Sequence, residues 1–455
     1  MFRFLVFCFT LVCVTSSSGF ATPQADSKTS EALTIKEAVD EAIKNNYDIK
    51  KTQQSQKSAA YGKKAAIAEM LPSVSANYRY ANMSEIPVMK MDMGSMLAAS
   101  GLPASPGRSP VQVGEHENVS WDVTVTQPLF TGFALYNNYK KSGLDLDIKA
   151  LEVTRTKNEV AADARNACYN LLLAQKMAAV AEDAVKSLTA HRDNSEKFYA
   201  KGMIPFNDLL KIKVALADAQ QTFEKASASV SKADGWLHVV LGREDAKKTS
   251  LQSDVNEPEG VMALNWYLDE GLKRRPEIKI LKNSMKSADS AKKIAGSAFY
   301  PHVYVIGRYE RSGDDLLAEE NIYSNEHNST IAVNATWNLF ESGKTRAGMA
   351  KFHHAKLALT EQLNGTKALI RYEIEASWTD LKVAEKNITT SKGALSQARE
   401  NKRITDLQYH QQMAASTDVL DAQSFLSGIE KNYYEALYGY MSSLADLERA
   451  AGISI

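Results

Sequence analysis

The sequence predicts an α+β protein made of two structural repeats, each with a helix, two β-strands and a long helical hairpin. Residues 262–309 repeat the layout of residues 33–80, and both copies place a proline between a helical and an alternating segment. The hydrophobic period changes at that proline from helical to two, which indicates strands. Further along each repeat it becomes a heptad, which indicates coiled-coil packing. These three patterns together predict the fold class.

The first residues predict a secretion signal. Arg3 precedes an apolar run over residues 4–14, and a Ser-rich stretch leads to a small-x-small sequence that ends at Ala21. We therefore interpret residues 1–21 as a signal peptide and expect the protein to be exported. An N-terminal membrane anchor is the alternative, but the apolar run is too short to span a bilayer. Cys168 is then the only cysteine of the mature protein, and one thiol cannot form an internal disulfide.

The repeats divide the mature chain. We expect a first repeat over residues 22–242 and a second over residues 262–455, joined by a polar linker over residues 243–261. Each repeat begins with a helix that is interrupted early, and the break near Tyr47 aligns with Pro276, a residue type that ends helices.

Two segments of each repeat read as strands, because apolar and polar residues alternate along them. They are residues 73–80 and 119–126 in the first repeat, and 303–309 and 331–337 in the second. This length and alternation are typical of a transmembrane β-strand, although a small soluble β-domain with one wet face would show the same pattern. Five aromatic residues lie where a lipid-facing girdle would: Tyr78, Tyr80, Trp121, Tyr309 and Trp337.

Four strands cannot close a barrel, since small single-chain barrels need about eight. An open sheet edge in lipid would leave its backbone polar groups unsatisfied. We therefore expect several copies to pool their strands. Two copies would give eight strands and three would give twelve, and the alternation alone does not choose between them.

The connection between the first two strands is the longer one. Its residues 84–110 are rich in Pro, Gly and Ser, which predicts a loop. A Met-x-Met pattern lies within it and suits a soft ion such as Cu(I) or Ag(I), although an apolar surface loop is the plainer interpretation. The methionines concerned are Met89, Met91, Met93 and Met96.

Long helical patterns follow each strand pair. The first spans about 68 residues from Tyr136, roughly 100 Å at 1.5 Å per residue. Gly202 and Pro205 interrupt it, and a strict heptad of apolar residues begins at Leu209. The same tip recurs at residues 409–420. The chain should therefore form two long hairpins with similar tips.

The charge balance gives no support for nucleic-acid binding, and the motifs give none for catalysis. Basic and acidic residues balance at 54 each, which gives no electrostatic footprint for nucleic acid. The eight histidines are scattered, and no phosphate loop, zinc signature or nucleophile elbow is present. We expect a protein that is not an enzyme and needs no cofactor.

At this point the ordered set of features resembles the TolC-like outer-membrane efflux protein family. The resemblance covers residues 33–452, and its sharpest marks are IKNNYDI, LKRRPEI, the junctions QPLFTG and WNLFESG, and the two tips. It implies a homotrimer with a twelve-stranded β-barrel in the outer membrane, continued by a tunnel of helices in the periplasm. The implied function is a passive exit duct of a tripartite efflux or type I secretion system, docked onto a periplasmic adaptor protein and an inner-membrane pump.

Carried over residue by residue, the resemblance assigns the periplasmic gate to Asp418, Asp421, Asp208 and Tyr409. The two aspartates of the second tip would line a constriction, although Asp418 is also placed to cap a helix. The adaptor would dock on the residues at the turns, which are Gly202, Met203, Ile204, Pro205, Met413, Ala414 and Ala415.

The chain departs from the family pattern at two positions of the second tip. Gln412 stands where a glycine is usual, and Ala414 stands where some relatives carry a basic latch residue. A different class of function, a structural periplasmic coiled-coil or fibre protein without a pore, is the alternative to the channel.

Overall fold

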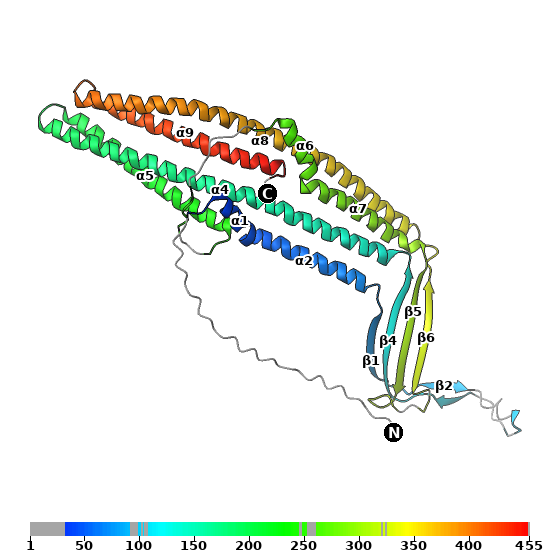
Figure 1. Ribbon diagram of the computed structural model, residues 1–455. Helices are drawn as coiled ribbons and strands as arrows, with labels where there is room; N and C mark the ends of the chain where they lie inside the picture. Colours follow the sequence, from blue (N-terminus) through cyan, green and yellow to red (C-terminus); the bar gives the residue numbers. More distant parts are fainter. Residues whose placement is uncertain are drawn as a thin grey trace.

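The computed structural model describes residues 32–91, 99–101, 103, 108–244, 248–252, 261–319, 322–323 and 325–453. The chain is elongated: long helices run together from two tips at one end to a β-sheet at the other (Figure 1). The expected signal peptide lies outside the described residues. No helix in the described ranges is long and apolar enough to cross a bilayer.

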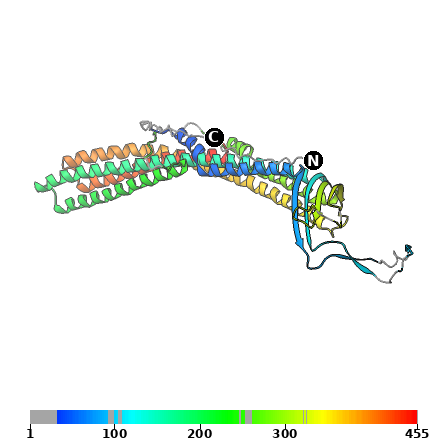
Figure 2. The ribbon, with the colours of Figure 1, turned by 90° about the horizontal axis from the view of Figure 1, so that it is seen from below.

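The first repeat has the expected order of elements. It contains α1 (Ile35–Asn45), α2 (Tyr47–Ala68), β1 (Ser73–Asn82), β4 (Glu117–Thr131), α4 (Ala134–Ala200) and α5 (Phe206–Leu241). The prediction of a loop over residues 84–110 is wrong in part. The segment contains β2 (Val88–Met91), which pairs with β3 (Ser109–Gln112) in a hairpin that extends away from the main sheet (Figure 2). Each of these strands has only four residues, which is too short a run for its periodicity to be distinguished from that of a loop.

The second repeat follows the same plan. It contains α6 (Leu264–Arg274), α7 (Pro276–Gly296), a short 3-10 turn η1 (Ser297–Phe299), β5 (His302–Gly313), β6 (His327–Thr336), α8 (Lys344–His410) and α9 (Ser416–Ala450). The predicted helix breaks are confirmed, because one extended residue separates the two short helices of each repeat. Asn46 separates α1 from α2 and caps the latter through Asp48 N, while Arg275 precedes Pro276 at the first position of α7.

The four long strands form one antiparallel sheet in the order β1-β4-β5-β6. The register places Tyr78 opposite Trp121 and Val123 opposite Tyr309, so the predicted apolar positions share one face. The opposite face is polar: Asp122 accepts hydrogen bonds from Asn77, Thr124 and Arg308. The sheet thus has one apolar and one polar surface, as the alternation predicted.

Each strand pair joins its long helix through two consecutive residues in the left-handed conformation. Gly132 and Phe133 have φ of 58° and 66°, and Ser342 and Gly343 have φ of 48° and 84°. A Cβ at position 132 would lie 2.4 Å from the carbonyl oxygen of Ser297, so only glycine fits there. The shared geometry turns both 67-residue helices away from the sheet in the same way.

The helices bury their heptad seams. The first tip's seam begins with Leu209, Ile212 and Leu216, of which no side chain exceeds 5% exposure. Two larger cores form where the short helices cover the long ones. One contains Leu171 and Leu241 beneath α1, and the other contains Ile374, Tyr440 and Leu447 beside α6 and α7. The duplication therefore extends from sequence to core.

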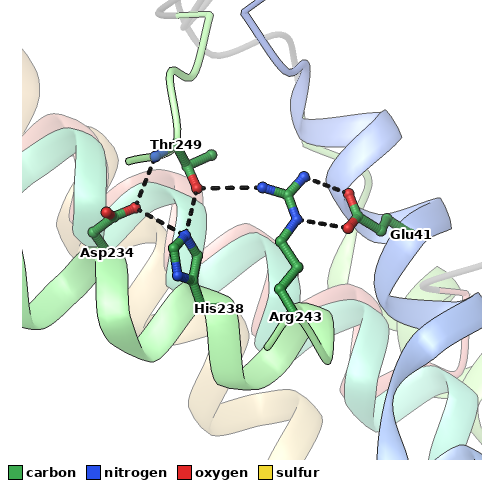
Figure 3. A network of polar contacts seen from close by, with 5 residues as sticks. All are labelled: Glu41, Asp234, His238, Arg243 and Thr249. Carbon is green, nitrogen blue, oxygen red and sulfur yellow. Dashed lines mark hydrogen bonds and ion pairs between the residues drawn. The ribbon is translucent and has the colours of Figure 1, made fainter. Parts of the chain in front are cut away.

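A polar network at the first core fixes part of the segment between the repeats. Arg243 donates two hydrogen bonds of 2.6 Å to the carboxylate of Glu41 in α1 and one to the Thr249 hydroxyl (Figure 3). The same hydroxyl lies 2.9 Å from Nε2 of His238, and the Thr249 amide donates to Asp234. These contacts hold residues 248–252 against the body of the protein.

The held segment pairs with Leu33, which lies just before α1. The amide of Leu33 donates to Ser250 O at 2.8 Å, and the amide of Gln252 donates to Leu33 O at 3.0 Å. The predicted linker is therefore structured over these residues. Loss of the network should free both backbone bonds.

We predict that Glu41→Gln weakens this attachment by about 1.5–3 kcal/mol, because the Arg243 guanidinium loses its charged bidentate partner. Hydrogen exchange measured by mass spectrometry should show faster exchange at Leu33 and Gln252. Asp40→Asn is the matched control, since this neighbouring acid is exposed and forms no hydrogen bond or ion pair in the described part of the chain. Equal exchange in the two variants would contradict the prediction.

Candidate functional site: the paired helical tips

The two tips lie side by side at the end of the molecule opposite the sheet (Figure 1). Each turn contains one left-handed residue, Gly202 with φ of 69° and Gln412 with φ of 60°. Glutamine is strained there, at a cost of about 1 kcal/mol. Its side chain reaches the other tip of the same chain, with Nε2 of Gln412 at 3.6 Å from Sδ of Met203. The departure at position 412 thus adds a contact between the hairpins.

Tyr409 ties the two hairpins together within one chain. Its side chain is 5% exposed, and its hydroxyl lies 2.7 Å from the hydroxyl of Ser195 in α4. The ring packs edge-on against His191, with centroids 4.6 Å apart, and also against Phe198. Tyr409, which the family resemblance assigns to the gate, thus contacts the other hairpin of the same chain.

His191 extends the link to a third helix. Its Nε2 lies 3.0 Å from the hydroxyl of Ser416 at the start of α9. Burial lowers the pKa of His191 to about 4, and the nearby positive charge of Lys402 acts in the same direction. Lys402 is itself buried and bonds Asp406 at 2.6 Å. Sequence reasoning missed this polar cluster, whose signal is a run of polar residues at seam positions of α4 and α8.

The predicted gate carboxylates have different surroundings. Asp208 is half-buried and pairs with Lys211 at 3.3 Å. Asp418 is exposed and accepts a 2.9 Å hydrogen bond from the amide of Ala415, so it caps α9. Asp421 is exposed and makes no ion pair in the described ranges.

A groove runs along the hairpins from Asp421. It lies between α5 and α9 over α4 and has a volume of about 690 Å³. Asp421 contributes to the α9 wall and Asp218 to the α5 wall, with small residues such as Ala181 and Ala184 from α4. Asp218 was not singled out from the sequence, because one acid on a solvated helix face carries no signal by itself.

The predicted docking residues form the blunt end of the molecule. Most are exposed, including Gly202, Pro205 and Ala415, while Ile204 and Ala414 are half-buried. The two methionines are the apolar side chains that protrude: Met203 is 47% exposed and Met413 is 74% exposed. Ala414 has a methyl side chain and offers no group that could form an ion pair.

The predicted girdle residues lie at both ends of the sheet. Tyr78, Trp121 and Tyr309 cluster near the loop end with Tyr80 on the same face, and the rings of Trp121 and Tyr309 are 5.5 Å apart. Trp337 follows the last residue of β6 at the helix end, where its Nε1 donates to Phe299 O at 3.1 Å. Four of the five predicted girdle residues therefore lie near the loop end of the sheet, and Trp337 lies at its helix end.

The methionine pattern is only partly described. Met89 and Met91 lie on β2, two residues apart and exposed. Met93 and Met96 lie outside the described residues. Among the described residues, no group of three or more His, Cys, Asp or Glu side chains could hold a metal ion.

The structure thus joins a sheet with one apolar face to two long helical hairpins whose tips lie at the opposite end of the molecule. The family profile described as "Outer membrane efflux protein" matches residues 38–243 and 267–453. The chain belongs to this family and is an outer-membrane efflux channel. The alternative of a fibre protein without a pore is therefore wrong. No curated protein sequence matches the chain.

Solved structures share the fold at low identity. The chain is similar to the CmeC outer membrane channel of Campylobacter jejuni, with a TM-score of 0.75, 15% identity, and coverage of 92% of this chain and 86% of that one. For VceC of Vibrio cholerae the TM-score is 0.71 and the identity 15%, with coverage of 92% of this chain and 96% of that one. The MtrE outer membrane channel of Neisseria gonorrhoeae was solved in an open state. Its TM-score is 0.70 and its identity 15%, with coverage of 92% of this chain and 88% of that one.

We predict that the tips loosen as the pH falls from 6.5 towards 4. The pKa of His191 is lowered in the folded state, so the unfolded state binds more protons in that window and stability is lost on acidification. Titration of labelled histidine by NMR should give a pKa near 4 for His191, and limited proteolysis at the tips should increase below pH 6. His191→Gln keeps a hydrogen-bonding side chain but cannot titrate, so it should remove this pH dependence. A pKa near 6.5 for His191 would contradict the proposal that this side chain causes the loosening of the tips.

Proposed function

We propose that three copies of the chain form one exit duct, with a twelve-stranded barrel in the outer membrane and a helical tunnel in the periplasm. The observation that carries this proposal is the sheet, which has one apolar face and two strand edges that pair with nothing in the described part of the chain. In lipid each unpaired backbone group costs several kcal/mol. Pairing of β6 with β1 of the next copy satisfies both edges at once.

The duplication supplies the register of that seam. Tyr80 lies opposite Val119 in the first repeat, and the equivalent Tyr309 lies opposite Ser329 in the second. The repeats are thus in the same register. By the same equivalence, the pairing of Val123 with Tyr309 between β4 and β5 places Val333 opposite Tyr80 of the next copy.

Disulfide cross-linking tests the seam. The double variant Val333→Cys with Tyr80→Cys should form covalent dimers and trimers on oxidation in outer-membrane preparations, because paired residues have Cβ atoms about 5 Å apart. The control pairs Val333→Cys with Arg79→Cys, whose side chains lie on opposite faces of the sheet. Cys168 does not compete, since burial raises its pKa to about 12. Cross-linking of the control but not of the test pair would overturn the register.

The tips are proposed as the periplasmic gate and docking surface. Asp418 and Asp421 would ring the mouth with carboxylates, and Asp208 and Tyr409 would hold the hairpins together. The exposed turn residues, above all Met203 and Met413, would contact a periplasmic adaptor protein that leads to an inner-membrane pump. Support comes from Asp421, whose exposed carboxylate lines the groove and makes no ion pair in the described ranges, and from the MtrE structure, which is of an open state.

The remaining assignments follow from this arrangement. Residues 1–21 would direct export and leave the mature protein, residues 22–242 and 262–455 would be the two efflux repeats, and residues 243–261 would join them. The sheet would contact outer-membrane lipid through its apolar face, with the girdle residues at its two margins. Transport would be passive, because the energy comes from the pump.

Removal of the gate charges should lower cation selectivity. The double variant Asp418→Asn with Asp421→Asn keeps the shape and the capping acceptor but removes two negative charges per chain. In planar bilayers its potassium-to-chloride permeability ratio should fall about fivefold, the factor that ~1 kcal/mol of charge attraction corresponds to. Glu375→Gln, on an exposed part of α8 far from the tips, is the control. An unchanged ratio in the double variant would remove the carboxylate ring from the proposal.

A further inference from the structure

A cavity of about 410 Å³ lies at the junction between the sheet and the long helices. One wall comes from the turn between β4 and α4, with Phe133, Tyr136 and Asn137. The facing wall comes from the end of α7 and the turn into β5, with Lys293 and Tyr300. Neither the gate nor the docking surface uses this cavity, because it lies at the other end of the long helices.

Aromatic rings connect the cavity to the apolar face of the sheet. Phe130 pairs with Val303 on that face, and its ring contacts Phe133 and Tyr300 edge-on with centroids 5.3 and 6.4 Å apart. Phe133 and Tyr136 are still 56% and 59% exposed. Half-exposed aromatic rings at the margin of an apolar surface are typical of the boundary between membrane and water.

The cavity also offers a positive charge and polar groups. Lys293 is exposed at the end of α7, and its ammonium group has no hydrogen-bond or ion-pair partner among the described residues. Asn137 is buried in the facing wall, where its amide nitrogen donates to Phe133 O. A basic group beside aromatic rings at a membrane boundary suits an anionic lipid headgroup.

The position within the sheet keeps the cavity available after assembly. It lies at the ends of β4 and β5, the two inner strands, each of which already has a neighbour on both sides. Pairing between copies uses β1 and β6 at the outer edges. At the level of the strands, the cavity therefore lies outside the seams of the proposed barrel and is repeated once per chain.

We propose that this cavity binds one anionic glycerophospholipid per chain. The phosphate would lie beside Lys293, and the glycerol and first acyl carbons would lie on the rings of Phe133 and Tyr300. The inference rests on the proposed assembly, in which the helices lie in the periplasm and this junction lies at the periplasmic leaflet. Its effect would be to fix the depth of the barrel in the membrane.

Native mass spectrometry of the full-length protein in detergent tests the site. Phosphatidylglycerol and phosphatidylcholine with the same acyl chains are added separately, and bound lipids per assembly are counted. We expect phosphatidylglycerol to be retained more tightly, and Lys293→Gln to weaken it about fivefold while leaving phosphatidylcholine unchanged. Lys293→Arg keeps the positive charge and should retain phosphatidylglycerol as the unaltered protein does. Lys292→Gln, the preceding residue outside the cavity, should behave as the unaltered protein.

Three outcomes would overturn the proposal. These are equal retention of the two lipids, equal loss of phosphatidylglycerol in the Lys292 and Lys293 variants, and displacement of the lipid by millimolar inorganic phosphate alone. The last result would mean that the cavity is a simple anion site. The mass of the assembly is read in the same spectrum, so failure of trimer formation is seen separately from failure of lipid binding.

Discussion

The unpaired backbone groups of β1 and β6 are the constraint on which the architecture depends. A four-stranded sheet with one apolar face can enter a bilayer only if its edges are satisfied, and one chain supplies no strand that could do this in the described ranges. In the proposed trimer, closure through identical copies would satisfy these edges. Because the two repeats share one register, each seam between copies would have the geometry of the seam between repeats. Barrel formation and assembly would then be the same event.

The same logic applies to the helices. α7 packs between α4 and α8, and α2 packs against α4 on the other side, so α8 lacks the neighbour on one flank that α4 has. In the proposed trimer, the α2 helix of the next copy, which is equivalent to α7, would occupy that place. At the tips the contacts change character: the seams of leucine and isoleucine give way to a buried set of Tyr409, His191 and Ser195. Polar contacts need specific partners, so they favour one arrangement of the hairpins over a sliding interface.

Much of this could be predicted from the residues. Pro72 and Pro301 marked the change from helix to strand, the alternation placed Tyr78 and Trp121 on one face, and the heptads gave the long hairpins. The short hairpin of Val88 to Met91 with its partner strand could not be predicted, because four-residue strands carry too little periodic signal. The cluster at His191 was also missed, since its partners come from three helices that are far apart in the chain.

The sequence by itself determined the two repeats, the strand faces and the hairpin tips, because local periodicity and a shared proline encode each of them. The tertiary structure alone decided how these parts meet. It showed that Tyr409 bonds Ser195 within one chain, that Gln412 spans the two tips, and that the ends of β4 and α7 enclose a cavity beside Lys293. Each of these contacts joins residues separated by more than a hundred positions. Their proximity depends on the packing of long helices, and no local pattern records it.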